Sequence, residues 1–264
     1  NPNWFGITGT DSEAAVSAML ISFIAVGIWW GLFAQYAFYH VPRRNAREKQ
    51  VIKDVLFTGF RELNSVCIQL KENLRLKRFL YAYFVCSMAV QTIMLMAVYF
   101  GEEEISWANN NEKTMGLIIS ILVIQLVAVV GANMTSKAST RYGNIKTLIG
   151  INIIWMLVCV FAYFVKTPIE FYLTAAIVGF VMGGVQALSR STYSKFLPKT
   201  KDTTSYFSFY DVTEKVGIII GMSIYGTIDQ ITGTMRNAIL FLFVFYLCGI
   251  ILLFKLPRIN LTNN

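Results

Sequence analysis

The chain has 264 residues, of which 55% are apolar and only 14% are charged, with a formal net charge of +8. A soluble domain carries about a quarter of charged residues, and the apolar residues here stand in long blocks, so a soluble globular fold is excluded. The only histidine, His40, excludes a Ser-His-Asp triad within the apolar blocks and a metal centre with two histidines. The four cysteines show neither zinc-like spacing nor the pattern of a disulfide framework.

Seven apolar segments are long enough to cross a bilayer, because a hydrocarbon core of about 30 Å needs about 20 helical residues. Backbone polar groups in lipid must be satisfied within their own segment, so each segment is expected to be a helix. The predicted fold class is therefore all-α integral membrane, with seven transmembrane helices. In chain order the segments are Ala14–Tyr39, Phe79–Phe100, Thr114–Ser136, Thr147–Val165, Phe171–Ser189, Phe207–Ile228 and Met235–Phe254.

The loops between these segments alternate in charge. One set of loops is acidic and contains only two bases, Lys113 and Lys166. In the other set, the three loops that follow the first long loop are basic and contain one acid, Asp202. By the positive-inside rule the basic set is cytoplasmic, which predicts a multi-pass cell-membrane protein with its N-terminus outside and its C-terminus in the cytoplasm. This orientation accounts for the net charge, so nucleic-acid binding is unnecessary. The acidic set is 1–13, 101–113, 166–170 and 229–234, and the basic set is 40–78, 137–146, 190–206 and 255–264.

The first cytoplasmic loop is the longest and has the pattern of an amphipathic helix. Its apolar residues recur at helical spacing and basic residues are spread between them, which favours a helix on an anionic leaflet. A helix packed against the ends of the bundle is an equally good interpretation, and a partner-protein site is a third. The apolar set is Ile52, Leu56, Leu63, Cys67, Leu70 and Leu74, and the basic set is Lys53, Arg61, Lys71 and Arg75.

The loop divides the chain into four expected parts. These are an external segment with the first span (1–39), the basic linker (40–78), six helices (79–254) and a cytoplasmic tail (255–264). The six helices form two sets of three, and both sets begin on the cytoplasmic side. This arrangement is compatible with two inverted three-helix repeats, a common plan for transporters.

An outside-to-inside helix, a long basic loop, six helices and a cytoplasmic C-terminus resemble helices six to twelve of a major facilitator superfamily transporter. The run GANMTSKASTRYGNIK, Gly131–Lys146, is similar to that family's glycine-rich basic cytoplasmic turn. Gly131, Arg141, Gly143 and Lys146 carry the similarity, whereas the acidic residue usual in this turn is missing.

A closer similarity is to the Atg22-like, or UMF1, branch of this superfamily. Three runs carry it: GGVQALSRSTYSKFLP (Gly183–Pro198), SYFSFYDVTEKVGIIIG (Ser205–Gly221) and GTIDQITGTMRNAI (Gly226–Ile239). The resemblance implies about twelve helices in all, so an N-terminal half of the same transporter is expected as the partner of this fragment. It also implies alternating access and movement of a small solute, and vacuolar amino-acid efflux is known for members of this branch.

Three charged residues fall inside the sixth apolar segment, where a charge is costly and usually faces protein or water. Asp211 and Lys215 are four residues apart and can pair on one helix face, with Glu214 adjacent and Arg190 as a second partner. One interpretation is an inner gate whose ion pairs break during transport. A static salt bridge is the second, and proton coupling through Asp211 or Glu214 is the third.

Polar residues elsewhere in the spans are candidates for the solute pathway. Gln186 and Ser189 share a face at the end of the fifth segment and can line a cavity together with Arg190. Gln91 and Gln125 are similar candidates, although amides at this depth more often serve helix packing. In the superfamily the third helix of each repeat is peripheral, so the resemblance demotes the remaining amide candidate, Asn152. Glycine pairs four residues apart in the fifth and sixth segments favour close helix contacts: Gly179 with Gly183, and Gly217 with Gly221.

The leading hypothesis is thus a part of a secondary transporter that acts without a cofactor, apart from the proton coupling considered above. A seven-helix receptor or photoreceptor shares the predicted orientation, but the seventh segment, Met235–Phe254, has no lysine for a retinal Schiff base. A membrane-embedded enzyme is disfavoured by the single histidine and the few carboxylates within the spans.

Overall fold

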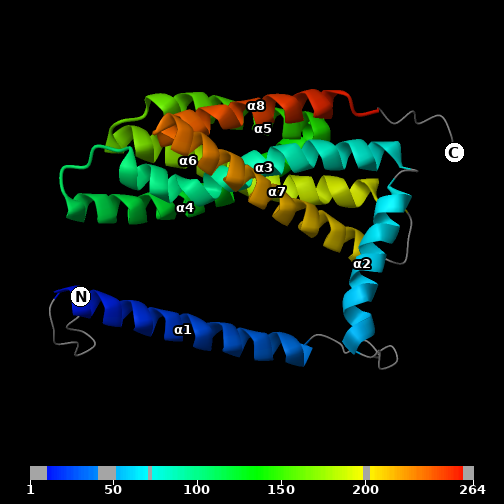
Figure 1. Cartoon of the computed structure of the whole chain (residues 1–264), viewed down its shortest axis with the longest axis horizontal. Helices are drawn as coiled ribbons and strands as arrows, with labels where there is room; N and C mark the ends of the chain where they lie inside the picture. The colour runs from blue at the N-terminus through cyan, green and yellow to red at the C-terminus, as the bar shows by residue number, and fades with distance from the viewer. Residues whose placement is uncertain (1–10, 41–51, 71–72, 199–202, 258–264) are drawn as a thin grey trace. The chain divides into compact units, whose positions relative to one another are not determined.

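The computed structural model describes residues 11–40, 52–70, 73–198 and 203–257, and these residues form eight α-helices and no strand. The helices therefore confirm the all-α class. They are α1 (Asp11–His40), α2 (Ile52–Gln69), α3 (Leu74–Glu103), α4 (Asn110–Tyr142), α5 (Asn144–Phe164), α6 (Pro168–Phe196), α7 (Thr203–Thr232) and α8 (Met235–Phe254), as labelled in Figure 1.

Six of these helices are long and apolar enough to cross a membrane: α1 from Val16 onward, α3, α4, α5, α6 and α8. The multi-pass membrane class is therefore confirmed, but the predicted count of seven spans is not. The sixth predicted segment, Phe207–Ile228, lies inside α7, which is 30 residues long. This helix falls outside the apolar set because Asp211, Glu214 and Lys215 interrupt it.

The chain divides into two compact units, residues 1–56 and 57–264. In the first unit, α1 is apolar around its whole circumference, and neighbouring Trp29 and Trp30 are 64% and 72% exposed. A helix without a polar face needs an apolar surround such as lipid, which fits the first predicted span.

In the second unit, α3 to α8 lie lengthwise beside one another, with α7 crossing them obliquely (Figure 1). Among the strongest helix pairs, α4 packs on α6, α3 on α7, and both α3 and α6 contact the pair formed by α5 and α8. The same set of pairs is obtained when α3, α4 and α5 are replaced by α6, α7 and α8, and the reverse. The pair α4–α6 then corresponds to α7–α3, and the pair α5–α6 corresponds to α8–α3. The two sets of three helices therefore pack by one common pattern.

The core is built where α5 and α8 face α3. Trp155 of α5 and Tyr246 of α8 are fully buried, and their rings stack with centroids 6.1 Å apart. Beside them Gly249 of α8 meets Cys86 of α3, where an added Cβ would lie 2.2 Å from the sulfur atom.

Glycines bring α4 and α6 into backbone contact. A Cβ added at Gly131 of α4 or at Gly179 or Gly183 of α6 would lie 2.6 Å or less from a main-chain oxygen of the other helix. Lipid offers no hydrophobic driving force for joining helices, so this close packing supplies much of the association. Gly179 and Gly183 of α6 thus allow the close helix contact predicted for them, and Gly131 of α4 allows the same contact from the other side.

We expect Gly183→Leu to destabilise the protein by about 1–3 kcal/mol or more, because the new side chain has to displace the Ala128 backbone, 2.3 Å from the added Cβ. The measurement is the thermal unfolding of the purified protein in detergent. Gly150→Leu is the matched control, since no atom lies within 4 Å of a Cβ built there. Equal melting temperatures for the two variants would contradict the assigned contact.

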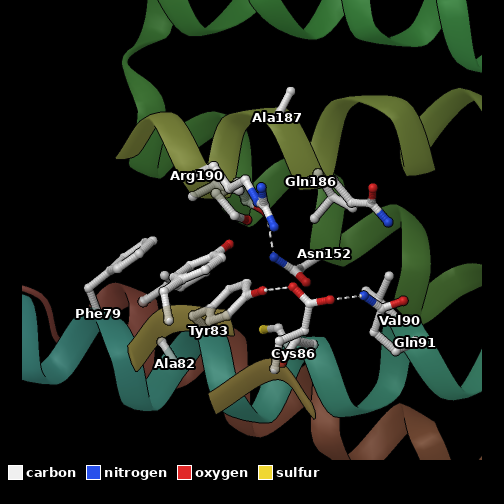
Figure 2. A pocket seen from close by; sticks show the side chains of 17 residues that line it. Phe79, Ala82, Tyr83, Cys86, Val90, Gln91, Asn152, Gln186, Ala187 and Arg190 are labelled. Carbon is white, nitrogen blue, oxygen red and sulfur yellow. Dashed lines mark hydrogen bonds between the residues drawn. The ribbon is translucent and has the colours of Figure 1, made fainter. Parts of the chain in front are cut away.

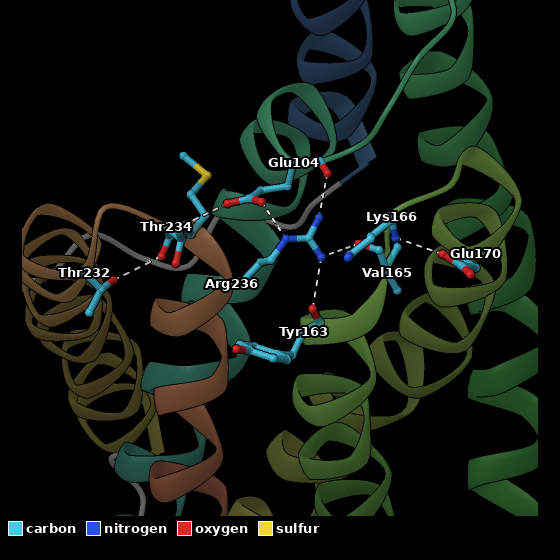
Figure 3. A network of polar contacts seen from close by, with 9 residues as sticks. Glu104, Tyr163, Val165, Lys166, Glu170, Thr232, Thr234 and Arg236 are labelled. Carbon is cyan, nitrogen blue, oxygen red and sulfur yellow. Dashed lines mark hydrogen bonds and ion pairs between the residues drawn. The ribbon is translucent and has the colours of Figure 1, made fainter.

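At the other end of the bundle, one guanidinium ties three helices together (Figure 3). The Nε atom of Arg236, in the first turn of α8, lies 2.6 Å from Oε2 of Glu104, the residue that ends α3. Its other nitrogens donate to the main-chain oxygens of Glu104, Tyr163 and Val165, which lie at the C-terminal ends of α3 and α5. Because terminal carbonyls lack helical partners and carry the negative end of the dipole, this cation caps two helices at once.

The basic linker contains α2, as the amphipathic pattern predicts, while residues 41–51, 71 and 72 lie outside the described part, as do the side chains of Ile52 and Leu56. Its buried residues in the described part are Val66 and Leu70, whereas Cys67, expected on the apolar face, is exposed. The helix also meets α7, because Gln69 accepts a hydrogen bond of 2.6 Å from the Tyr206 hydroxyl. The C-terminal half of α2 therefore packs against the helical bundle, as the second interpretation of the linker predicted.

Two predicted loop boundaries were wrong. Helix α4 continues to Tyr142, so the glycine-rich basic run is helical up to Gly143, whose φ of +89° ends the helix. Helix α6 continues to Phe196, so Arg190 lies within a helix and not in a loop. In both cases polar helical turns extend the helix beyond its apolar segment, and hydropathy alone does not register them.

Candidate functional site

A cavity of about 430 Å³ opens among α3, α5, α6 and α7 of the second unit (Figure 2). Polar side chains from each of these four helices line it, next to an apolar base that includes Phe79 and Val90. Ligand sites in helical bundles have this composition, a mostly apolar wall with a few convergent polar groups. The polar set is Tyr83, Ser87, Gln91, Asn152, Gln186, Ser189, Arg190, Tyr210 and Glu214.

Glu214 is the carboxylate of this cavity, and its side chain is only 15% exposed. It lies eleven residues into α7, about 16 Å along the helix axis. Its two oxygens accept hydrogen bonds of 2.8 Å from the Tyr83 hydroxyl and from the Gln91 amide. The nearest cation, the Lys215 ammonium, is 3.8 Å away and 70% exposed, so the close partners of Glu214 are neutral.

The aromatic partner of Glu214 is itself held by packing. The Tyr83 ring stacks on Tyr210 of α7 with centroids 4.2 Å apart, and the Tyr210 ring packs at 4.8 Å on buried Tyr193 of α6. The Tyr193 hydroxyl donates to the Tyr206 carbonyl at 2.7 Å, which fixes the far end of the stack. The position of the Tyr83 hydroxyl is therefore set by three helices.

Arg190 and Asp211 form an ion pair of 2.9 Å between α6 and α7 at the edge of the cavity. Both side chains are more than half exposed, at 58% and 52%. The expected pairing of Asp211 with Lys215 is not among the ion pairs of the described residues, because the side chain of Asp211 turns to α6 and Lys215 lies near Glu214. The second expected partner, Arg190, is the one found.

The structure brings most of the expected pathway residues to this one cavity. Gln91, Gln186 and Ser189 line it, and the Gln186 amide reaches the Met94 sulfur at 3.8 Å. Gln125 does not, because it lines a separate, smaller pocket between α3, α4 and α6.

Four polar members of the site were not predicted from the sequence: Tyr83, Ser87 and Tyr210 were not named, and Asn152 was demoted. Asn152 was set aside because the third helix of each repeat was expected to be peripheral, yet it lies on the cavity wall (Figure 2). Its amide nitrogen donates to the Leu148 carbonyl at 2.8 Å, while Oδ1 is buried without a partner in the described part of the protein. Tyr83 is one of 13 tyrosines, and no sequence signal distinguishes it from those that anchor span ends.

The cytoplasmic-turn candidates lie apart from the cavity. Gly143 and the adjacent Asn144 form the short connection between α4 and α5, and the Asn144 amide contacts the Thr192 hydroxyl and the Lys195 ammonium of α6 at 3.0 and 3.2 Å. Arg141 and Lys146 are exposed beside it. The turn therefore ties the end of α6 to the α4–α5 connection.

Fold and site together define a multi-pass helical membrane protein with a polar cavity among its helices. Residues 5–260 match the family described as vacuole effluxer Atg22 like, and the chain belongs to this family. The resemblance drawn from the sequence is thereby confirmed. This chain is also 30% identical over 248 residues to the uncharacterized MFS-type transporter YxiO of Bacillus subtilis. The match covers 94% of this chain and 56% of that protein.

Fungal relatives give the same picture. Autophagy-related protein 22 of Eremothecium gossypii is 26% identical, with 87% of this chain and 48% of that protein covered. The protein of the same name from Saccharomyces cerevisiae is 29% identical over 194 residues. The chain spans about half the length of the first of these relatives. The relatives point to a transporter and not to an enzyme, and none supports the receptor alternative.

Proposed function

We propose that this chain is the C-terminal part of a secondary active transporter that moves a small solute by alternating access. The observation that carries this proposal is the Glu214 carboxylate, held in a cavity among four helices by neutral partners from α3. An ionisable group within a membrane bundle is costly and is retained where solutes or ions pass. The cavity is this half's share of the pathway, and the missing N-terminal half supplies the facing wall.

The proposed architecture extends what the helices themselves establish. Helix α7 also spans the membrane, as the sixth of seven spans in chain order. Helices α3–α5 and α6–α8 are two inverted repeats of one half-bundle, which the exchangeable pattern of helix pairs supports. The four parts 1–39, 40–78, 79–254 and 255–264 keep their assigned roles, with the N-terminus of the chain outside and the C-terminus in the cytoplasm of a cell-membrane protein. The basic loops support this orientation.

The proposed solute class is a small amphoteric molecule such as an amino acid. Polar side chains of the wall, among them Gln186 and Ser189, offer hydrogen-bond partners for the charged groups of such a solute. Arg190 at the edge supplies a cation when its pairing with Asp211 opens. The name of the family, vacuole effluxer, fits export of a small solute.

The test is solute counterflow by the full-length protein in liposomes, with mixtures of radiolabelled amino acids as first substrates. Gln186→Trp fills the cavity and is expected to lower counterflow at least about tenfold, because a bound solute has to occupy the same volume. Leu173→Trp is the matched control on α6, since Leu173 is 57% exposed and lines none of the cavities described here. Equal loss in both variants, or full counterflow in Gln186→Trp, would remove this cavity from the pathway.

The gating role of Arg190, Asp211 and Lys215 stays a proposal of its own. The observed pair joins two helices of the same bundle, so it can gate only by exchanging partners with the facing half. An exposed pair of this kind contributes about 0–1 kcal/mol to folding, so Asp211→Asn is expected to leave the melting temperature nearly unchanged. Its counterflow rate should change several-fold if the pair gates, and an unchanged rate would exclude both gating and coupling at Asp211.

A further inference from the structure

A second cavity, separate from the first, lies between the C-terminal half of α2 and the first three turns of α3 and α7, with a volume of about 310 Å³. Its walls are apolar and include Leu70, Leu80, Phe84 and Phe209. One cation, Lys77, stands in this wall, and Tyr81 lies one helical turn further along α3. We call this cavity the α2 groove.

Lys77 is the unengaged member of a cluster of three cations. The Arg75 guanidinium lies 4.3 Å above the Phe196 ring, and Arg78 donates to the Lys255 carbonyl at 3.1 Å. Among the described residues, no acidic group or ring engages Lys77, although its side chain is half-buried. The Tyr81 hydroxyl likewise has no hydrogen-bond partner in the described part of the chain.

A half-buried ammonium that has no counter-ion among the described residues and is set in an apolar wall is matched by an anion that carries an apolar tail. We propose that the α2 groove binds an anionic glycerophospholipid, with its phosphate on Lys77 and Tyr81 and one acyl chain along Leu80, Phe84 and Phe209. A soluble phosphate would pair with the cation but would make no favourable contact with the apolar walls. The geometry therefore favours a lipid over a free phosphate. Basic pockets between helices at the cytoplasmic face are where membrane proteins hold such headgroups.

The position of the groove gives the lipid a structural consequence. The polar contacts between α2 and α7 include Gln69 with Tyr206 at 2.6 Å and Glu62 with Ser205 at 3.3 Å. A lipid between α2, α3 and α7 adds apolar contacts to the same junction. Binding to this folded arrangement alone stabilises it by mass action, so melting should rise with lipid concentration.

Cys67 provides a reporter, because it lines the α2 groove and is exposed. The experiment uses the full-length protein with its other exposed cysteines, Cys248 included, replaced by serine, and follows alkylation of Cys67 by a maleimide in detergent. Phosphatidylglycerol is expected to slow this reaction about fivefold, while phosphatidylcholine and glycerol phosphate leave the rate unchanged. Lys77→Gln should remove the protection, Lys77→Arg should keep it, and Lys137→Gln, at an exposed lysine on α4, should behave as the parent protein.

Several results would overturn the proposal. Equal protection by both phospholipids would mean a chain site without headgroup selection, and protection by glycerol phosphate would mean a simple anion site. A Cys67 that reacts slowly under every condition would mean that a protein segment covers the groove. None of these outcomes bears on solute transport, which is measured separately.

Discussion

Glu214→Gln in the full-length protein is expected to abolish solute accumulation driven by a pH gradient while leaving solute counterflow largely intact. Counterflow requires only that the loaded carrier change its orientation, whereas driven accumulation requires a group that takes up and releases the coupling proton. Glu214 is the one cavity carboxylate of the described residues whose close partners, Tyr83 and Gln91, are neutral. The single ion pair of this carboxylate among the described residues is the long contact of 3.8 Å with the exposed Lys215 ammonium, so it can lose or gain a proton without breaking a close ion pair. A neutral amide at this position cannot carry the coupling proton. Accumulation ratios should fall to unity, the value for an uncoupled carrier.

The measurement is uptake into liposomes under an imposed pH gradient, beside counterflow in the same preparation. Glu102→Gln is the matched control. Glu102, in the last turn of α3, lies outside the cavity lining and pairs at 2.9 Å with Lys113 in the first turn of α4. Driven accumulation by Glu214→Gln equal to that of the parent would exclude coupling at this residue. Loss of counterflow as well would assign Glu214 to solute binding in place of coupling, and Tyr83→Phe would then be expected to weaken binding in the same direction.

Hydropathy predicted the membrane class and seven of the helices, six of which are apolar enough to span, because long apolar runs have one stable form in lipid. It was less reliable for α7, where Asp211, Glu214 and Lys215 lower the apolar character of a helix that nonetheless runs unbroken for 30 residues. The helix ends were also placed too early, since polar turns such as Lys137–Tyr142 continue α4 beyond its apolar part. Length and charge thus indicate where a chain meets lipid, and backbone hydrogen bonding decides where each helix stops.

Residue types in the spans pointed to Gln91, Gln186, Ser189, Arg190 and Glu214, all of which line one cavity. The pairing inside that cavity was not predictable, because α3 and α7 are more than a hundred residues apart in the chain and either carboxylate could face Arg190. Asn152 was demoted because the third helix of each repeat was expected to be peripheral. Its residue type alone, an amide that is buried in the structure, would have kept it among the candidates. Arg236 is a third case: its partner Glu104 lies 132 positions away, in a cluster of three glutamates that gives no sign of which one is buried.

Glu104→Gln is expected to lower the free energy of unfolding by about 3–5 kcal/mol, because it breaks a largely buried ion pair. The side chains of Glu104 and Arg236 are 18% and 15% exposed, and the glutamine leaves the guanidinium buried with carbonyl oxygens as its only partners (Figure 3). The carboxylate also accepts the Met235 backbone N–H at 3.0 Å, so the start of α8 is anchored through the same group. The amide can still accept one of these bonds, which is why the loss is assigned mainly to the unpaired charge.

Arg236→Met tests the ion pair with Glu104 separately from the hydrogen bonds that Arg236 donates to the helix ends. It removes the cation but leaves the main-chain oxygens at the ends of α3 and α5 without their donor, so it too is expected to destabilise the protein. The double variant Glu104→Gln with Arg236→Met should be more stable than the sum of the single losses predicts, by about 1–3 kcal/mol, because no buried charge remains unpaired. Thermal unfolding of the four proteins in one detergent gives this coupling energy, with Glu102→Gln as the surface control. Strict additivity would mean that the two side chains do not act as a pair, and Arg236 would then stabilise the fold through its carbonyl contacts alone.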